Sequence, residues 1–433
     1  MYETVKQEIQ NYMEEKRSYL INFLKKMIFF DSRTLDSGRR GREEGLQKFV
    51  AEKLMSIGAN RVDVFEPDNE AIKDLPGFHP NHRYKNRPNV VAVFLGKGGG
   101  RSLVVNGHAD ITDPGSSELW RSNPFQCVER DGFLIGRGTA DMKGGLASAI
   151  LALEALRLTG VRLKGDVILM SVVDEKGGGN GTLACLQKGY RADAAVITKG
   201  TGLAIHAANH GSFSADFTVF GHSVHAAVKD QGVSAIEKAY YLIGALHRLE
   251  EQWKNTKKHP LLHSPTINVG QISGGIHASV VPGTCSVKFD VEYLPCEYDE
   301  NGEALPLDRE AVKRDVQMAL LQACEEDEWL RHHPVSVRWY QELSAFQTDV
   351  SSAFVQEAAR SVEASLGRAE ISGYPAECDG IHFSRLAQMP VILFGPGRLE
   401  DAHRENEQLS IEEYLNHIRA LCNLIVDWVG VEE

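Results

Sequence analysis

The sequence predicts an α/β protein in which a mixed, largely parallel sheet covered by helices is interrupted by a smaller βαββαβ module. The first part and the end of the chain alternate short apolar runs with helical patterns, which is typical of a parallel sheet covered on both faces. Between them the order changes to strand, helix, strand, strand, helix, strand. We therefore expect one α/β domain from residues 1–210 and 343–433, with a module inserted at 211–342.

The elements of the first part follow from their apolar patterns. The N-terminal 30 residues space their apolar side chains at helical intervals, whereas the later strands are continuous apolar runs of the kind that buried central strands need. Strands are expected at 89–96, 102–108, 166–173 and 194–198, and helices at 144–158 and between the last two strands. Ligands of such sheets usually lie at the carboxyl ends of the strands.

The inserted module and the C-terminal part follow in the same way. The module is expected to contain strands at 212–221, 266–273, 285–295 and 335–340, and helices at 234–253 and 308–330. The first pattern then resumes with a helix at 353–367, a strand at 390–397 and a last helix at 410–429.

Composition and charge exclude several classes of protein. The net charge is -12 and the basic residues are scattered, which argues against a nucleic-acid partner. The cysteines are seven, far apart and without a C-x-x-C pair, a pattern typical of reduced thiols. The N-terminal segment has no uninterrupted apolar stretch and no small-residue cleavage site, so neither secretion nor a membrane partner is predicted. We expect a cytoplasmic protein.

Histidines and acids follow the predicted strands at four separate places. His108 and Asp110 share a face just after one apolar run, and Asp141 stands in a glycine-rich stretch before a helix. An acid pair at 174–175 opens the loop "DEKGGGNG", and His403 follows a glycine and proline turn. These residue types can hold a metal, orient its ligands or move protons, so their recurrence at strand ends predicts one functional site.

These motifs resemble those of a known family of hydrolases. "GHAD", "W…NPF", "DGFLIGRGTADMKGG", the acid pair before "GGNGT", "GHSVHAA", "GG…VVPG" and "FGPG…AH" stand in the order found in the acetylornithine deacetylase, succinyl-diaminopimelate desuccinylase and carboxypeptidase G family. The resemblance covers essentially the whole chain. It implies a dinuclear zinc amide hydrolase whose inserted module is a lid that often forms a dimer.

The resemblance also implies a role for each matching residue. Zinc makes water nucleophilic near neutral pH and polarises an amide carbonyl, while a carboxylate takes and returns the proton. By motif, His108 resembles a ligand of one zinc, Asp141 the bridging carboxylate, His403 a ligand of the other zinc, Asp110 the partner of His108, Glu175 the general base, and His225 the lid histidine that reaches a neighbouring subunit's site.

Two positions depart from the family pattern at the metal centre. The family has a second glutamate where this chain has Lys176, and an acid ahead of Pro-Thr-Gly-Leu where it has Lys199. Each zinc therefore loses a carboxylate ligand and gains an ammonium, which has no lone pair while protonated. Exchanging two carboxylates for two ammonium groups adds four positive charges, the charge of two Zn²⁺ ions. Our hypothesis is that Lys176 and Lys199 replace the metals electrostatically, and it fails if both point to bulk water.

A shifted loop is the alternative interpretation. If the glycine loop carries one extra residue, Asp174 becomes the base and Glu175 a ligand, which leaves Asp141, Glu175 and His403 around a single zinc. Three protein ligands and a water make a competent catalytic site. No similar shift supplies an acid in place of Lys199.

The substrate pocket departs from the family as well. Many members have an Asn before "VVP" and an Arg before the last strand's "LP", and both contact a substrate carboxylate; Ser279 and Glu292 stand there in this chain. The predicted function is amide hydrolysis of a small N-acyl amino acid, acylated or formylated amine or dipeptide-like molecule, with zinc or another divalent metal, as one ion rather than two, or with none. The alternative is a metal-free, repurposed member that binds a small molecule or catalyses a metal-independent reaction. A homodimer through the lid is expected from the resemblance.

Overall fold

The computed structural model describes residues 2–36, 38–298, 304–306 and 308–432. These residues divide into two compact units. Unit 1 comprises Met1–Ala207, Gln347–Tyr374 and Cys378–Glu433, and unit 2 comprises Ala208–Phe346 and Pro375–Glu377. The boundaries expected from the sequence were residues 211 and 342.

Unit 1 is built on an eight-stranded sheet with the order β17-β10-β18-β9-β5-β8-β4-β3. Its four central strands, β18, β9, β5 and β8, are mutually parallel, while β10, β4 and β3 pair antiparallel with their neighbours. The predicted mixed, largely parallel α/β sheet is therefore confirmed. The strands are β3 (Arg61–Phe65), β4 (Asn89–Phe94), β5 (Leu103–His108), β8 (Val167–Val172), β9 (Ala195–Ile197), β10 (Ile205–Asn209), β17 (Ile371–Tyr374) and β18 (Val391–Leu393).

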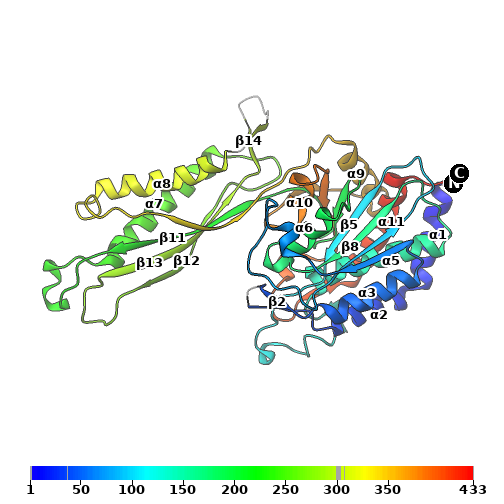
Figure 1. Ribbon diagram of the computed structural model, residues 1–433, viewed down its shortest axis with the longest axis horizontal. Helices are drawn as coiled ribbons and strands as arrows, with labels where there is room; N and C mark the ends of the chain where they lie inside the picture. The colour runs from blue at the N-terminus through cyan, green and yellow to red at the C-terminus, as the bar shows by residue number, and fades with distance from the viewer. Residues whose placement is uncertain (1, 37, 299–303, 307, 433) are drawn as a thin grey trace. The chain divides into compact units, whose positions relative to one another are not determined.

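Helices cover both faces of this sheet, as Figure 1 shows. Helix α5 packs against β5 and β8 and against α11, and α6 packs against β4 and β8. The residues of α5 from Gly144 to Leu156 are buried on all sides, which explains its almost uninterrupted apolar sequence. The helices are α1 (Tyr2–Glu15), α2 (Arg17–Phe29), α3 (Glu44–Ser56), α4 (Asn69–Ile72), α5 (Gly144–Leu158), α6 (Asn180–Gln187), α9 (Ala353–Leu366), α10 (Gly380–Arg385) and α11 (Ile411–Val429).

Smaller elements of unit 1 shape the loops beyond the strand ends. Strand β19 pairs with β7, which pairs with β6, and β1 pairs with β2. These strands are β1 (Thr34–Leu35), β2 (Arg40–Gly41), β6 (Val128–Arg130), β7 (Phe133–Ile135) and β19 (Gln408–Ser410).

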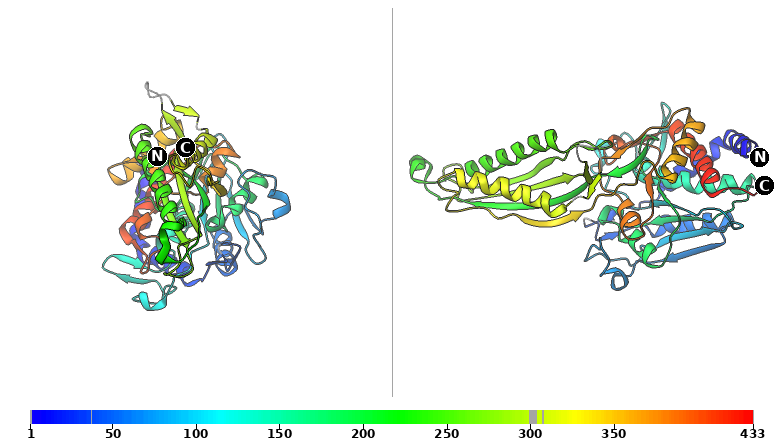
Figure 2. Two further views of the ribbon diagram at one scale, coloured as in Figure 1. Left: turned by 90° about the vertical axis from the view of Figure 1, so that its left-hand side faces the viewer. Right: turned by 90° about the horizontal axis from the view of Figure 1, so that it is seen from above.

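Unit 2 has the expected order of strand, helix, strand, strand, helix, strand. Its four-stranded antiparallel sheet has the order β12-β13-β11-β16, and Figures 1 and 2 show α7 and α8 on one side of it. Alternate side chains of β11 are buried because only one face of the sheet is covered. The elements are β11 (Gly211–Phe220), α7 (Ala235–Thr256), β12 (Ile267–Gly274), β13 (Thr284–Tyr293), α8 (Arg309–Glu326) and β16 (Arg338–Leu343), with an additional hairpin of β14 (Cys296–Tyr298) and β15 (Ala304–Pro306) that we did not predict.

Two sequence expectations concern the whole chain. Among the described residues, none of the helices combines the length and the apolar character that a membrane span requires. The seven cysteines, all of which the structure describes, are free thiols. A cytoplasmic location stays a prediction.

Candidate active site

Six ionisable side chains of unit 1 meet beyond the central parallel strands. Because β5, β8 and β9 run parallel, their carboxyl ends lie at one edge of the sheet, the usual place for a ligand site. Strand β5 ends in His108. The turn after β8 supplies Glu175 and Lys176, and the turn after β9 supplies Lys199. The bend Thr139–Lys143 before α5 and the loop after the turn Leu399–Asp401 complete the group. We call His108, Asp141, Glu175, Lys176, Lys199 and His403 the unit 1 cluster.

Asp141 lies at the centre of the unit 1 cluster, with two partners on each carboxylate oxygen. His108 Nε2 lies 3.1 Å from Oδ1, and Lys199 Nζ lies 3.1 Å from the same oxygen. His403 Nε2 lies 2.9 Å from Oδ2, which also accepts a hydrogen bond from Lys176 Nζ. Each oxygen of Asp141 is therefore contacted by one imidazole and one ammonium.

Glu175 connects the same two ammonium groups on their other side. Its Oε1 lies 2.5 Å from Lys199 Nζ, and its Oε2 lies 2.9 Å from Lys176 Nζ. The two carboxylates and the two ammonium groups thus form a closed ring of alternating charge. All four side chains are at most 9 % exposed, so water screens these ion pairs little. Both lysines face the carboxylates and not bulk water, and their replacement of the metals stays a hypothesis.

The ring fixes the protonation state of its members. Burial alone would raise the pKa of Asp141, but the ammonium groups of Lys176 and Lys199 outweigh burial and hold this pKa well below its usual range. The same balance lowers the pKa of Glu175 strongly. Burial alone would lower the pKa of Lys199, yet Asp141 and Glu175 raise it well above the usual value. Both acids are therefore ionised and the lysine is protonated at neutral pH.

Asp110 holds the loop that carries Glu175 and Lys176. Its carboxylate accepts the backbone N–H of Lys176 at 2.9 Å and that of Glu175 at 3.3 Å. We expected Asp110 to orient His108 with its side chain. The His108 imidazole instead donates from Nδ1 to the backbone oxygen of Asp110 at 2.8 Å, while the Asp110 carboxylate lies 3.6 Å from Nδ1. This contact leaves Nε2 of His108 to face Asp141.

The shifted-loop alternative is wrong, because Asp174 points away from the cluster. Its carboxylate accepts a hydrogen bond from the Tyr84 hydroxyl at 2.5 Å and lies 2.9 Å from His82 Nδ1. Arg87 contacts it at 3.4 Å and binds Glu43 at 2.8 Å. Asp174 is fully buried with these partners, so Glu175 is the acid that faces the cluster. The segment that supplies His82, Tyr84 and Arg87 was not singled out from the sequence; its only signal is its polar residues between two apolar runs.

A second supporting pair lies behind Asp141. Glu407 accepts the backbone N–H groups of Ala140 at 2.8 Å and Asp141 at 3.0 Å, and its other oxygen lies 2.7 Å from Arg137. This buried ion pair fixes the bend that carries Asp141. Arg137 is therefore structural in this chain. Glu407 has no signal in the sequence beyond being an acid near His403.

The remaining predicted residues lie in unit 2. His225 is exposed and precedes a short turn, where its Nδ1 accepts the backbone N–H of Ala227 at 3.1 Å. Ser279 is exposed and its hydroxyl lies 2.8 Å from His277 Nδ1. Glu292 is on β13, where its carboxylate accepts a hydrogen bond from Thr266. Of the predicted site residues, His108, Asp141, Glu175 and His403 are brought together, and all four belong to unit 1.

The donor set of the unit 1 cluster does not fit a pair of zinc ions. Zinc binds through lone pairs of imidazole, thiolate or carboxylate groups, and a protonated ammonium has none to offer. The Nζ atoms of Lys176 and Lys199 contact both oxygens of Asp141, the carboxylate that would bridge two ions. A dication beside two buried ammonium groups would also be repelled by them.

The family of the chain follows from comparison with known proteins. Residues 104–427 match the model of peptidase family M20/M25/M40. The chain belongs to this family. It is 35 % identical over 370 residues to an N-formyl-4-amino-5-aminomethyl-2-methylpyrimidine deformylase from Halalkalibacterium halodurans, covering 80 % of this chain and 84 % of the relative. It is 27 % identical over 361 residues to a probable succinyl-diaminopimelate desuccinylase from Staphylococcus aureus, covering 77 % and 84 %.

Solved structures of several peptidases share the fold. Aminopeptidase PepT from Bacillus cereus matches 95 % of this chain and 98 % of its own, with a TM-score of 0.70 and 21 % identity. A dipeptidase from Saccharomyces cerevisiae matches 99 % of this chain and 98 % of its own, with a TM-score of 0.72 and 16 % identity. A Bacillus subtilis peptidase described as dinuclear and metal-binding matches 96 % and 99 %, with a TM-score of 0.64 and 15 % identity. At these identities the likeness establishes the fold only.

The comparisons confirm the predicted family, fold class and reaction class. The named relatives are amidohydrolases, and the prediction of an amide-bond hydrolase of this family is confirmed. Names such as metallo-carboxypeptidase and dinuclear metal-binding peptidase support a divalent metal in the family in general. The number of ions in this chain is a separate question, which the unit 1 cluster raises.

Proposed function

We propose that the chain hydrolyses the amide bond of a small N-formylated or N-acylated amine at the unit 1 cluster, without zinc. The single observation that carries the proposal is the convergence of His108, Asp141, Glu175 and His403 with two lysines at the end of the central strands. The acids and histidines are those that the family pattern places at the reaction centre, and the lysines take the contacts that two metals would need.

The lysines have donors left for a substrate. Each ammonium has three hydrogens, and in the described contacts Lys176 and Lys199 each use two, one on Asp141 and one on Glu175. The third hydrogen of each is available for a carbonyl oxygen. Two cationic donors on that oxygen stabilise the negative charge that develops when water attacks the carbonyl carbon. This is the electrostatic part of what a metal supplies in the family.

Glu175 is the group placed to accept the proton of the attacking water. It takes the proton as the carbon–oxygen bond forms and returns it to the amine as the carbon–nitrogen bond breaks. Because the adjacent ammonium groups lower the pKa of Glu175 strongly, it is a weak base. We therefore expect slow turnover relative to a centre whose base is not paired with two lysines.

The substrate class rests on two observations. The relatives of 35 % and 27 % identity from Halalkalibacterium halodurans and Bacillus subtilis are named as deformylases of a formylated aminomethylpyrimidine. By the family resemblance, Ser279 and Glu292 also stand where many members have an Asn and an Arg that contact a substrate carboxylate, and neither residue carries the positive charge of that Arg. Both observations favour an amine substrate without a free carboxylate.

Formate release tests the proposal directly. The purified full chain, treated with EDTA and then dialysed, is incubated with N-formyl-4-amino-5-aminomethyl-2-methylpyrimidine, and formate is measured with time. Succinyl-diaminopimelate and a dipeptide serve as carboxylate-bearing comparisons. We expect formate release that EDTA does not abolish and little cleavage of the other two. A rate that requires added zinc would overturn the metal-free centre, and preferred cleavage of a carboxylate substrate would overturn the substrate class.

Binding without hydrolysis is the second candidate, and the low pKa of Glu175 specifically favours it. Here the cluster would hold a small amide through the same lysine donors but lack a base strong enough to activate water. In this case isothermal titration with the formylated pyrimidine gives a saturable heat while no formate appears. If the titration gives no heat and no formate appears, this substrate class is excluded for both candidates.

We also propose the homodimer through the lid that the family resemblance implies. Strands β12 and β16 are the two edges of the unit 2 sheet, and edge strands present unpaired backbone groups. On and beside β12, Ile272 is 50 % and Ile276 is 90 % exposed. His225 would act across such a dimer at the partner's cluster. Light scattering after size exclusion tests the proposal, since a monomeric mass at micromolar concentration would contradict it.

A further inference from the structure

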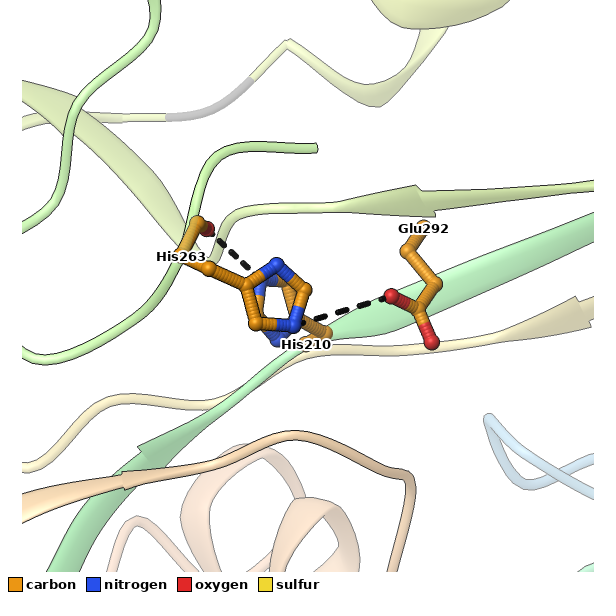
Figure 3. A group of neighbouring side chains, drawn as sticks. All are labelled: His210, His263 and Glu292. Carbon is orange, nitrogen blue, oxygen red and sulfur yellow. Dashed lines mark hydrogen bonds and ion pairs between the residues drawn. The ribbon is translucent and has the colours of Figure 1, made fainter. Parts of the chain in front are cut away.

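Unit 2 contains a second group of potential metal ligands, shown in Figure 3. His210 lies between β10 and β11, His263 lies in the segment between α7 and β12, and Glu292 lies on β13. One ligand atom from each lies within 4.8 Å of the other two. Among the described residues this is the only group of three or more His, Cys, Asp or Glu that meets this condition. We call these three residues the unit 2 cluster.

The hydrogen bonds of His210 leave one of its nitrogens free for a ligand. Its Nε2 lies 3.0 Å from the backbone oxygen of His263, which only accepts, so Nε2 carries the hydrogen. Nδ1 is then a lone-pair nitrogen, and it is buried without a hydrogen-bond partner. The His210 side chain is 1 % exposed, and burial lowers its pKa to about 4, so the ring is neutral at pH 7. A buried lone pair without a donor is costly unless something binds it.

His263 is oriented in the same manner. Its Nδ1 donates to the backbone oxygen of Ser264 at 2.8 Å, which leaves Nε2 as the nitrogen that faces Glu292. Nε2 lies 4.0 Å from Oε2 of Glu292, an ion-pair distance too long for a hydrogen bond; Figure 3 marks this contact with a dashed line. Histidines that bind metals usually donate their other N–H to a carbonyl or carboxylate, which fixes the tautomer and the ring. Both histidines of the unit 2 cluster have this arrangement.

Glu292 supplies the negative charge of the cluster. Its Oε2 accepts a hydrogen bond from the Thr266 hydroxyl at 2.9 Å, a contact typical of a carboxylate that also binds a metal. Among the described residues, no lysine or arginine forms an ion pair with Glu292. The unit 2 cluster thus has two imidazole lone pairs and one carboxylate, but no cation from the chain.

We propose that the unit 2 cluster binds one zinc ion through His210 Nδ1, His263 Nε2 and a Glu292 oxygen, with water as the fourth ligand. Two imidazoles and a carboxylate suit zinc better than calcium or magnesium, which prefer oxygen ligands. Ligands of a tetrahedral zinc lie about 3.3 Å apart, and the rings of His210 and His263 are stacked with their centroids 4.2 Å apart, so His263 must rotate for both lone pairs to point at one ion. The side chain of His263 is 50 % exposed and has room to rotate.

The consequence of the site is local. The ion connects the segment 257–266 to β13 and to the start of β11, three parts of unit 2 that are distant in the sequence. Because zinc would bind the folded arrangement and not the unfolded chain, it stabilises unit 2 by mass action. This role is independent of the reaction at the unit 1 cluster.

Zinc binding to variants of the full chain tests the proposal. Chelator-treated protein is titrated with Zn²⁺ by calorimetry and with Co²⁺ by visible absorption, which reports tetrahedral coordination. We expect about one ion per chain in wild type, with affinity at least about 100-fold weaker in His263→Ala and Glu292→Gln. His263→Ala tests the site even if the buried His210→Ala fails to fold. His247→Ala removes an exposed histidine of α7 and serves as the matched control, with binding unchanged.

Asp141→Asn assigns the bound ion to one of the two clusters. We expect this variant to bind zinc as wild type does, because the change lies in unit 1. Zinc that is lost in Asp141→Asn but kept in His263→Ala would overturn the proposal, and so would wild-type protein that takes up no zinc. Two ions in wild type, one of them lost in His263→Ala, would support the unit 2 site and would overturn only the metal-free centre of unit 1.

Discussion

The two clusters contain the same kinds of metal-binding group and differ in where the positive charge comes from. In unit 1, two histidines and two carboxylates gather around the ammonium groups of Lys176 and Lys199. In unit 2, two histidines and a carboxylate converge, and no lysine or arginine of the described residues forms an ion pair with Glu292. Histidine and acid count alone therefore does not identify a metal site. Whether the chain itself supplies a compensating cation decides which cluster has lone pairs left for an ion.

The largest effect is expected when the difference between the clusters is removed. The double variant Lys176→Glu, Lys199→Glu restores two carboxylates and deletes both ammonium groups, so the unit 1 cluster should gain about two zinc ions. Formate release should rise by at least about 100-fold, because metals then activate the water and Glu175 regains basicity. Metal content is read by inductively coupled plasma mass spectrometry. The control variant Lys254→Glu, Lys258→Glu makes the same charge change on the surface and should alter neither the metal content nor the formate release. Unchanged metal content in Lys176→Glu, Lys199→Glu would contradict the comparison of the two clusters.

Removing one cation without restoring an acid should destabilise unit 1. Lys199→Met leaves Asp141 and Glu175 buried with one ammonium between them, and such a loss of a partner costs about 3–5 kcal/mol. Urea unfolding of the variant and of wild type at pH 7 measures the difference. Lys254→Met removes a lysine that is 45 % exposed and should change the free energy of unfolding by less than about 0.5 kcal/mol. Equal effects of the two substitutions would mean that the ring is not a stabilising unit.

The acid side of the stability profile should report the same ring. The pKa values of Asp141 and Glu175 are lower in the folded state than in the unfolded chain, so the folded state binds fewer protons. Their contribution is fully present above the unfolded values of about 4 and is lost as the pH falls towards the folded values. Urea unfolding from pH 6 to pH 3 should therefore show a shallower decline for Asp141→Asn than for wild type. The exposed control Asp131→Asn should keep the wild-type slope; a wild-type slope in Asp141→Asn would be evidence against the lowered pKa.

The sequence predicted the parts of the fold and site that depend on local pattern. Continuous apolar runs predicted the central strands, and strand-end motifs predicted that His108, Asp141 and Glu175 belong to one site. The loop register could not be derived in this way, because Asp174 is held by His82 and other residues about 90 positions away. A loop rich in glycine permits either register locally, and only the contacts of the folded chain select one.

The unit 2 cluster was missed for a related reason. Its members lie on three segments with no common motif, and Glu292 was considered only as a substrate contact. The antiparallel register of β11 and β13, which pairs Ser212 with Glu292, brings His210 and Glu292 together. The tautomer of each histidine also depends on a carbonyl partner, which a sequence does not reveal.

The smallest effect is expected from the hydroxyl that supports Glu292. Thr266→Val keeps the shape of the side chain but removes the hydrogen bond to Oε2, so Glu292 is less well oriented for zinc. Loss of such a supporting contact weakens metal affinity by about 10-fold, less than loss of a ligand. Calorimetry with Zn²⁺ measures the change in affinity. Thr218→Val serves as the control, because Thr218 lies on β11 away from the unit 2 cluster and its hydroxyl contacts Ser286. Since the unit 1 cluster has its own cations, neither substitution should alter formate release, and a loss of activity in Thr266→Val alone would show that the two clusters are not independent.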